Sequence, residues 1–170
     1  MPLAPSGIRK VDVWGMEKRL WRDLPFFEEI ALEEVNTIDT EVPETDINFD
    51  FERCRWRNFH AFIARLTGSN VVDFSKYALW EFRDAVETQN VIAGLLDFRI
   101  PVVASWLKHA GQQLFSKVGA EKWDAWRDRF EDIGNDEQLQ ISEETRKGVE
   151  DLVRLTQRLK RGCDSTEPPS

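Results

Sequence analysis

The sequence has few of the residues that carry most protein chemistry: two histidines, two cysteines and one tyrosine among 170 residues. Neither Cys54 nor Cys163 belongs to a CxxC or zinc-type spacing, so we interpret both as reduced thiols of an intracellular protein. No Glu-x-x-His or HExxH pattern includes a histidine, which excludes the metal sites built on those motifs. We predict no metal and no cofactor. Haem is the alternative that stays open, because a single histidine is enough to provide its axial ligand.

Motifs for nucleophilic catalysis and phosphate binding are also missing. The chain has no G-x-S-x-G elbow, no G-x-x-x-x-G-K-[ST] loop and no G-x-G-x-x-G loop. It also lacks the DDxxD pattern that a magnesium-dependent cyclase needs. The sequence therefore favours a protein without catalysis and leaves enzyme activity open.

The chain has no long hydrophobic run and no excess of positive charge. Its longest apolar stretch, IPVVASWL, is far shorter than the ~20 residues that span a bilayer. The N-terminal MPLAPSGIRK lacks the apolar core of a signal peptide. The net charge of −8 argues against binding to nucleic acid or to an anionic membrane. We predict a cytoplasmic protein, of a size also compatible with the nucleus.

Helical periodicity dominates what is present. We expect an all-α, single-domain bundle of six or seven helices over residues 14–161, with no sheet. The rest is expected to be a flexible N-terminal arm (1–13), an acidic loop (37–50) and a disordered tail (162–170). That loop carries five acidic residues and no basic one. Without a glycine and the D-x-D-x-D-G spacing it does not fit a calcium loop, and a mobile linker is favoured over a binding lid.

Capping and breaking residues set the expected helix limits. Asp50, Asp73 and Ser142 are expected to cap helices, and Gly68 and Gly119 are expected to end them. Proline suits a first helical turn, so we expect helix 101–118 to begin at its proline. The other expected helices cover residues 14–21, 25–36, 51–67, 74–88, 120–133 and 143–161.

Both histidines are expected on helices. A helix turns about 100° per residue, which places His60 about 95° and His109 about 110° from the centre of the apolar face of its helix. Such boundary residues rest the ring on apolar neighbours and keep a nitrogen in water. They become candidates for proton transfer where two helix borders meet in a groove.

Seven tryptophans and eleven phenylalanines are a large aromatic content for one core. We therefore expect some of them to line a groove or a partner surface. The favoured function is a non-catalytic module that binds a protein or peptide, or a second copy of itself. The candidate binding residues are Trp56, Arg65, Trp80, Trp106, Trp123 and Trp126.

The alternative function is a small-molecule binder or a cofactor-independent enzyme. It would hold an apolar metabolite in an aromatic pocket between helices. His60, His109 and Arg65 would be its polar groups, with a histidine as general acid or base.

Four stretches together resemble a known family. They are WRNFHAFIARLT (56–67), DFSKYALWEFRDAVE (73–87), PVVASWLKHAGQQLF (101–115) and WDAWRDRF (123–130). In this order they resemble the fungal domain-of-unknown-function family 3632, and W-x-x-x-A-G is the most specific part. The resemblance covers about residues 14–155. It implies an all-helical, intracellular fungal protein and supplies no activity or catalytic residue.

Overall fold

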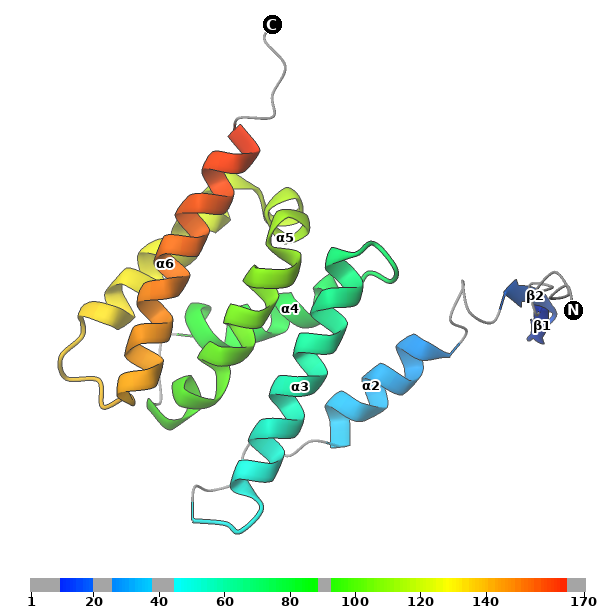
Figure 1. Ribbon diagram of the computed structural model, residues 1–170, viewed down its shortest axis with the longest axis horizontal. Helices are drawn as coiled ribbons and strands as arrows, with labels where there is room; N and C mark the ends of the chain where they lie inside the picture. Colours follow the sequence, from blue (N-terminus) through cyan, green and yellow to red (C-terminus); the bar gives the residue numbers. More distant parts are fainter. Residues whose placement is uncertain (1–9, 20–25, 38–44, 89–92, 165–170) are drawn as a thin grey trace, which may run out of the picture. The chain divides into compact units, whose positions relative to one another are not determined.

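The computed structural model describes residues 10–19, 26–37, 45–88 and 93–164 (Figure 1). The chain divides into two compact units, residues 1–52 and 53–170, and each is described by itself. The described residues form five α-helices, one π-helical turn and a two-stranded sheet. The mostly helical class is confirmed, whereas the helix count and the absence of a sheet were wrong. The predicted single domain over 14–161 stays a prediction.

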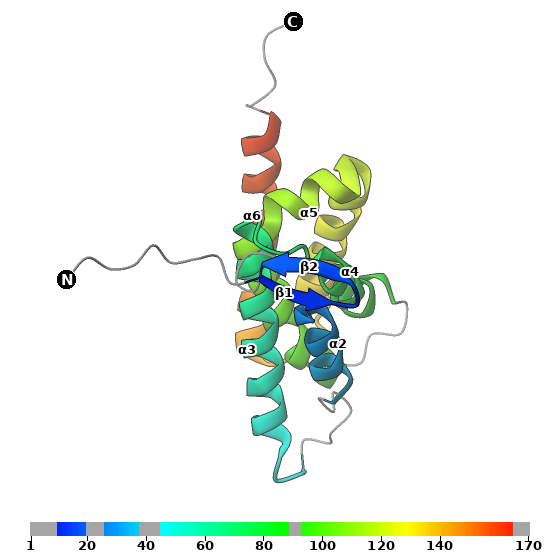
Figure 2. The same cartoon turned by 90° about the vertical axis from the view of Figure 1, so that its right-hand side faces the viewer.

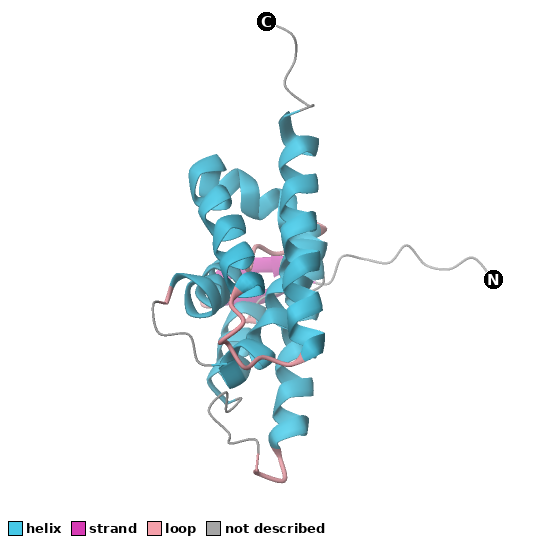
Figure 3. Ribbon diagram, turned by 90° about the vertical axis from the view of Figure 1, so that its left-hand side faces the viewer, coloured by secondary structure: helices cyan, strands magenta, loops and turns pink. Residues whose placement is uncertain are grey.

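The first unit contains a β-hairpin, drawn as two antiparallel arrows in Figure 2 and in magenta in Figure 3. Strand β1 spans Lys10–Val13 and β2 spans Met16–Arg19. The two turn residues, Trp14 and Gly15, have φ of 52° and 78°, as a two-residue hairpin turn of type I′ requires. Asp12 Oδ1 accepts a hydrogen bond from the Gly15 amide at 2.9 Å. The predicted short helix at 14–21 and arm at 1–13 were therefore wrong within residues 10–19.

Helix α2, Phe27–Thr37, follows the predicted pattern with acidic residues in its first turn. Of the predicted acidic loop, residues 38–44 lie outside the described residues, and 45–48 form a turn. Helix α3, Phe49–Gly68, begins earlier than expected. Asp50 therefore lies inside its first turn and does not precede it. Asp46 Oδ1 accepts the Asn48 amide at 2.7 Å beside the helix start.

The second unit places three helical stretches parallel to one another. They are α3, the first part of α5 (Ala93–Asn135), and α6 (Glu143–Asp164), with α5 between the other two (Figure 1). Arg53 Nη2 donates to the Asp97 carbonyl at 2.9 Å, and Trp106 Nε1 donates to His60 at 2.9 Å. These α3–α5 pairs are separated by similar numbers of residues, as parallel packing requires.

Between α3 and α5 the chain forms α4, Ser75–Phe82, and the π-helical turn η1, Arg83–Glu87. Phe74 is the N-cap position and no side chain caps this helix, so the prediction that Asp73 caps it was wrong; Asp73 Oδ1 instead accepts the Ser75 amide at 3.0 Å, one residue outside the cap. The helical segment ends at Glu87, close to the predicted end.

Pro101 lies inside α5, which starts at Ala93, so the prediction that the proline begins the helix was wrong. A proline has no N–H, which leaves the carbonyl four residues earlier without its intrahelical donor. That carbonyl belongs to Asp97, and the Arg53 side chain donates to it. A neighbouring helix therefore compensates for the proline.

The predicted break at Gly119 is confirmed, since its φ of 78° and ψ of 169° are not helical. Beyond it the chain turns back, and the last part of α5 packs antiparallel to α6. Trp123 Nε1 donates to the Thr156 carbonyl at 3.1 Å, and Lys160 Nζ lies 2.6 Å from an Asp124 carboxylate oxygen. These contacts close the helical hairpin.

Ser142 caps α6 as predicted, since its hydroxyl accepts the Thr145 amide at 3.1 Å. The Ser142 hydroxyl also donates to Asp97 Oδ1 at 2.8 Å. The helix continues to Asp164, so the predicted tail was wrong for residues 162–164; residues 165–170 lie outside the described residues. No described helix is long and apolar enough to cross a membrane.

Candidate functional site

The structure places most of the predicted binding aromatics in the core. Trp56, Trp106, Trp123 and Trp126 are all buried, so the prediction that they line a binding surface was wrong for these four. Several helices cover them, and the indole N–H groups of Trp106, Trp123 and Trp126 donate hydrogen bonds inside the protein. Trp126 Nε1, for example, donates to Glu87 Oε1 at 2.8 Å. Trp80 is 41% exposed and keeps a free face.

His60 is buried, so the expectation that it keeps a nitrogen in water was wrong. Its Nδ1 accepts the hydrogen bond from Trp106 Nε1, so the proton of the neutral ring lies on Nε2. Nε2 faces Glu81 Oε1 at 3.9 Å, beyond hydrogen-bond distance. A helical wheel considers one helix at a time, and here α5 covers the side of α3 that the wheel left in water.

Electrostatics make His60 a structural group. Burial, with the nearby Arg99 cation, lowers the pKa of His60 to about 3, so the ring is neutral near pH 7. Burial also raises the pKa of Glu81, against the effect of Arg99, whose Nη1 lies 3.0 Å from Glu81 Oε1. The Trp56 indole also favours the Glu81 carboxylate, without completing a hydrogen bond of good geometry. This cluster holds α3, α4 and α5 together.

His109 is half-buried, as predicted for a boundary residue. Partial burial lowers its pKa first, followed by the cations Arg65 and Lys108. Arg65 is exposed and donates to the Ala61 carbonyl of its own helix at 3.1 Å. Among the described residues, His60 bonds to Trp106, whereas Arg65 and Lys108 act on His109, so the two histidines have different neighbours.

A hollow of about 340 Å³ lies between α3, α5 and α6, and we name it the basic hollow. Its apolar floor is made by Ile100, Pro101 and Ala104 of α5. Gly148 of α6 allows the helices to approach, because a Cβ there would lie 3.3 Å from Ile100 Cγ2. The remaining lining residues are Arg57, Ser105, Lys108, Glu144, Thr145, Lys147 and Asp151.

Each of the three helices contributes one exposed cation to this hollow: Arg57 from α3, Lys108 from α5 and Lys147 from α6. Within the residues that the structure describes, none of the three forms an ion pair. Of the two acids, Asp151 already lies 3.6 Å from Arg154 Nη1. The lining as a whole therefore carries three cations and two acids, Glu144 and Asp151, and keeps a net charge of +1.

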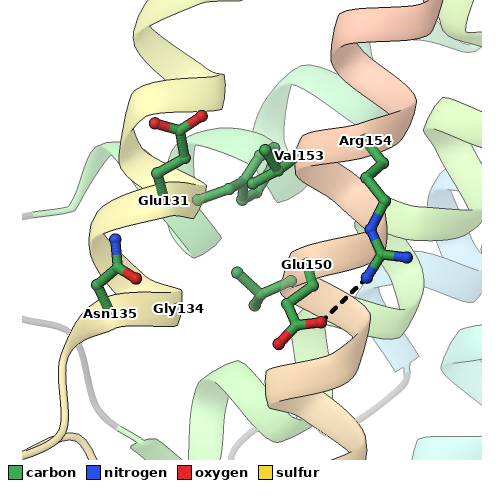
Figure 4. A pocket seen from close by; sticks show the side chains of 8 residues that line it. Glu131, Gly134, Asn135, Glu150, Val153 and Arg154 are labelled. Carbon is green, nitrogen blue, oxygen red and sulfur yellow. Dashed lines mark hydrogen bonds and ion pairs between the residues drawn. The ribbon is translucent and has the colours of Figure 1, made fainter.

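A second hollow, of about 300 Å³, lies between the last part of α5 and α6 (Figure 4). Its apolar lining includes Val149 and Val153, and its rim is charged. Here the charges pair within the protein, because Arg154 Nη2 lies 3.0 Å from Glu150 Oε2, the contact dashed in Figure 4. A self-neutralised rim selects a charged partner poorly, so the basic hollow is the better candidate.

Sequence reasoning missed the basic hollow for a definable reason. Arg57 lies close to Arg53 and Arg55 in the sequence, but alternate residues of one helix do not share a face, so this spacing predicts no basic site. Its actual neighbours, Lys108 and Lys147, belong to other helices. A signal was present nonetheless: residues 53–72 contain four arginines and no acidic residue, in a chain with net charge −8.

Metal binding finds no support in the described residues, where no three His, Cys, Asp or Glu side chains gather closely enough to hold an ion. Comparison with known proteins adds a family. A family model described as "Protein of unknown function (DUF3632)" matches residues 7–148, which confirms the resemblance drawn from the four stretches. No curated protein and no solved structure matches the chain.

Proposed function

Because this chain belongs to the DUF3632 family, whose description names no activity, we propose its function from its own geometry. The second unit is a non-catalytic binding module that takes a segment of a partner protein into the basic hollow. An apolar side chain of the partner covers the partly exposed Pro101 and Ala104, while the polar rim orients the segment.

One observation carries this proposal: an apolar floor open to solvent and surrounded by unpaired charge from three helices. A shallow apolar surface with a charged rim is typical of protein interfaces, where aromatic or aliphatic anchors fill small pockets. The alternative, an apolar metabolite in an aromatic pocket with a histidine as general acid or base, has less support. His60 is buried beside Trp106, and neither histidine lines one of the two hollows described above.

The rigid helices around the hollow favour a preformed site. Asp97 connects all three, since its carbonyl accepts from Arg53 and its carboxylate accepts from Ser142. A preformed site loses little conformational entropy when it binds. The buried tryptophans thus serve binding indirectly, by fixing the helices that surround the hollow.

Selection from a random peptide display library tests the proposal. We expect enriched peptides to bind the purified full chain and to lose affinity for Ala104→Phe, which fills the floor of the hollow. Ala125→Phe is the matched control, because Ala125 is exposed on the last part of α5, outside the lining of the hollow. Fluorescence anisotropy gives the affinities, and thermal unfolding verifies that both variants fold.

Equal binding to Ala104→Phe and to the unchanged chain would place the peptide site elsewhere and reject the hollow. Because Ala104→Phe also perturbs packing, Lys147→Glu serves as a second variant at the exposed rim. Light scattering of the free protein completes the test. A stable dimer that Lys147→Glu dissociates would identify a second copy as the occupant in place of another protein.

A further inference from the structure

We propose that the partner segment bound by the basic hollow is acidic, with carboxylates that pair with Arg57, Lys108 and Lys147 around one apolar anchor. This inference rests on the proposed function and specifies its partner. It commits to a protein segment rich in Asp or Glu.

The charge distribution supports an acidic partner. The whole chain has net charge −8, so acidic proteins are repelled from most of its surface. The region of α3 departs from this average, since residues 53–72 contain four arginines and no acid, and one of them, Arg57, lines the basic hollow. An acidic segment is therefore attracted to the three cations around the hollow, and such complementarity fixes orientation as well as partner choice.

The cations of the rim are free to pair. Other basic residues of this unit are already engaged: Lys117 lies near Asp73, Lys122 near Glu87, and Lys160 near Asp124. Arg57, Lys108 and Lys147 form no ion pair within the described chain, as is also true of Arg129 and Arg158 elsewhere in this unit, but these three lie around one hollow. A partner carboxylate thus gains an attraction without breaking an existing one.

The geometry limits the length of the segment. Along α5 the lining extends from Ile100 to Lys108, which at 1.5 Å per residue is about 12 Å. Two turns of a helix cover about 11 Å, as do three to four residues of extended chain. A short acidic segment with one central apolar residue therefore matches the length of the lining along α5.

His109 lies next to one cation of the rim, Lys108, and responds to its charge. It is half-buried and follows Lys108 in the chain, and Arg65 and Lys108 both contribute to the lowering of its pKa. The positive potential is thus felt by a neighbouring side chain as well as at the rim. His109 can therefore sense a bound acidic segment.

The test compares two versions of one peptide that differ only in charge: the acidic peptide and its amide twin. The tightest peptide from the display selection is synthesised with each Asp or Glu replaced by its amide. We expect the amide twin to bind about tenfold more weakly, as expected when several carboxylates pair with rim cations. Added salt should weaken the binding of the acidic peptide and leave the binding of the amide twin nearly unchanged.

Charge reversal in the protein provides the matching evidence. Lys147→Glu should weaken the binding of the acidic peptide about tenfold. Arg158→Glu is the control, because Arg158 is an exposed arginine of the same helix and borders a different hollow. Both variants change the net charge equally, so a difference between them reports local pairing.

The two histidines give a spectroscopic readout. With only His60 and His109 in the chain, imidazole NMR signals are readily assigned. Bound carboxylates should raise the pKa of His109 and leave buried His60 unchanged.

Failures of the two proposals are distinguishable. Suppose that the amide twin binds the unchanged chain as tightly as the acidic peptide does, but does not bind Ala104→Phe. The hollow then binds peptides without selecting their charge. This outcome rejects the acidic partner and leaves the proposed function standing. Enrichment of neutral or basic peptides has the same meaning. If Ala104→Phe has no effect, the proposed function falls as well.

Discussion

At the scale of single residues, the most constrained side chain is His60. It accepts a hydrogen bond from Trp106 through Nδ1, and it contacts the Trp56 ring with centroids 4.4 Å apart. The hydrogen bond and the burial favour the neutral ring, because protonation of Nδ1 would remove the acceptor and place a charge away from water. His60 therefore ties the stability of the fold to pH.

We expect the protein to lose stability as pH falls below about 6.5, the pKa of an unfolded histidine. Folding lowers the pKa of His60 to about 3, so between these values the unfolded chain binds a proton that the folded chain does not. Each pH unit in that range then costs up to about 1.4 kcal/mol. Urea unfolding of the unchanged chain and of His60→Asn, at pH 7 and pH 5, measures the effect.

Asparagine keeps an acceptor near the position of Nδ1 and removes the titration. Between pH 7 and pH 5, the free energy of unfolding of His60→Asn should therefore fall by about 2 kcal/mol less than that of the unchanged chain. His109→Asn is the control. His109 is only half-buried and its pKa is also lowered, so its removal should change the pH dependence in the same direction but less. An identical pH dependence for the His60 variant and the unchanged chain would show that folded His60 protonates freely.

At the scale of helices, one close approach fixes how α3 and α5 pack. A Cβ at Gly68 would lie 1.8 Å from the His109 carbonyl oxygen, and Gln113 Nε2 donates to the Gly68 carbonyl at 2.9 Å. Ala110, the next residue, has non-helical φ of −131°. The end of α3 thus contacts α5 where its helical geometry is interrupted.

The Trp-x-x-x-Ala-Gly pattern acquires a structural meaning from this contact. Trp106 donates to His60 of α3, Ala110 marks the interruption, and Gly111 brings α6 close. A Cβ at Gly111 would lie 2.5 Å from Leu159 Cδ1. Six consecutive residues therefore set the packing of α5 against both of its neighbours.

We expect Gly68→Ala to destabilise the protein by about 3 kcal/mol or to prevent folding, because the added methyl meets rigid backbone. Gly162→Ala is the control. A Cβ at Gly162 meets nothing within 4 Å, so that variant should be neutral or gain up to about 1 kcal/mol from helix propensity. Urea unfolding compares the two. A Gly68→Ala protein as stable as the control would show that the helices are not in close contact there.

Local sequence signals predicted helix limits correctly where a single residue determines that a helix starts or is interrupted. Ser142 starts α6 and Gly119 interrupts α5, because a hydroxyl cap and a positive φ act within one turn. Pro101 was misinterpreted because Arg53, distant in sequence, satisfies the carbonyl that it leaves without a donor. The hairpin was missed because Trp14 is an unusual residue at positive φ.

The candidate site was less accessible to sequence reasoning than the fold. Helical periodicity shows which residues of one helix face inward, but it does not show which helix covers them. His60 became buried and Arg57 gained Lys108 and Lys147 as neighbours through packing between helices alone. Both features depend on contacts between residues more than forty positions apart.

At the scale of the whole molecule, the large buried side chains belong almost entirely to the second unit. Of the buried apolar residues described, only Val13 and Ala31 belong to the first unit. The aromatic core, the His60 cluster and the basic hollow all lie in residues 53–170. A domain of roughly 120 residues can bury enough apolar surface to fold by itself. The first unit is therefore not needed for the core.

We expect a fragment of residues 45–170 to fold and unfold cooperatively on heating. It keeps Asp46, which accepts the Asn48 amide beside the start of α3, so that helix begins as in the full chain. Its five tryptophans should give five indole N–H signals in an NMR spectrum. Trp56, Trp106, Trp123 and Trp126 are buried within the second unit, so their signals should match those of the full chain. Collapsed signals or gradual unfolding would show instead that the core of the second unit depends on residues 1–44.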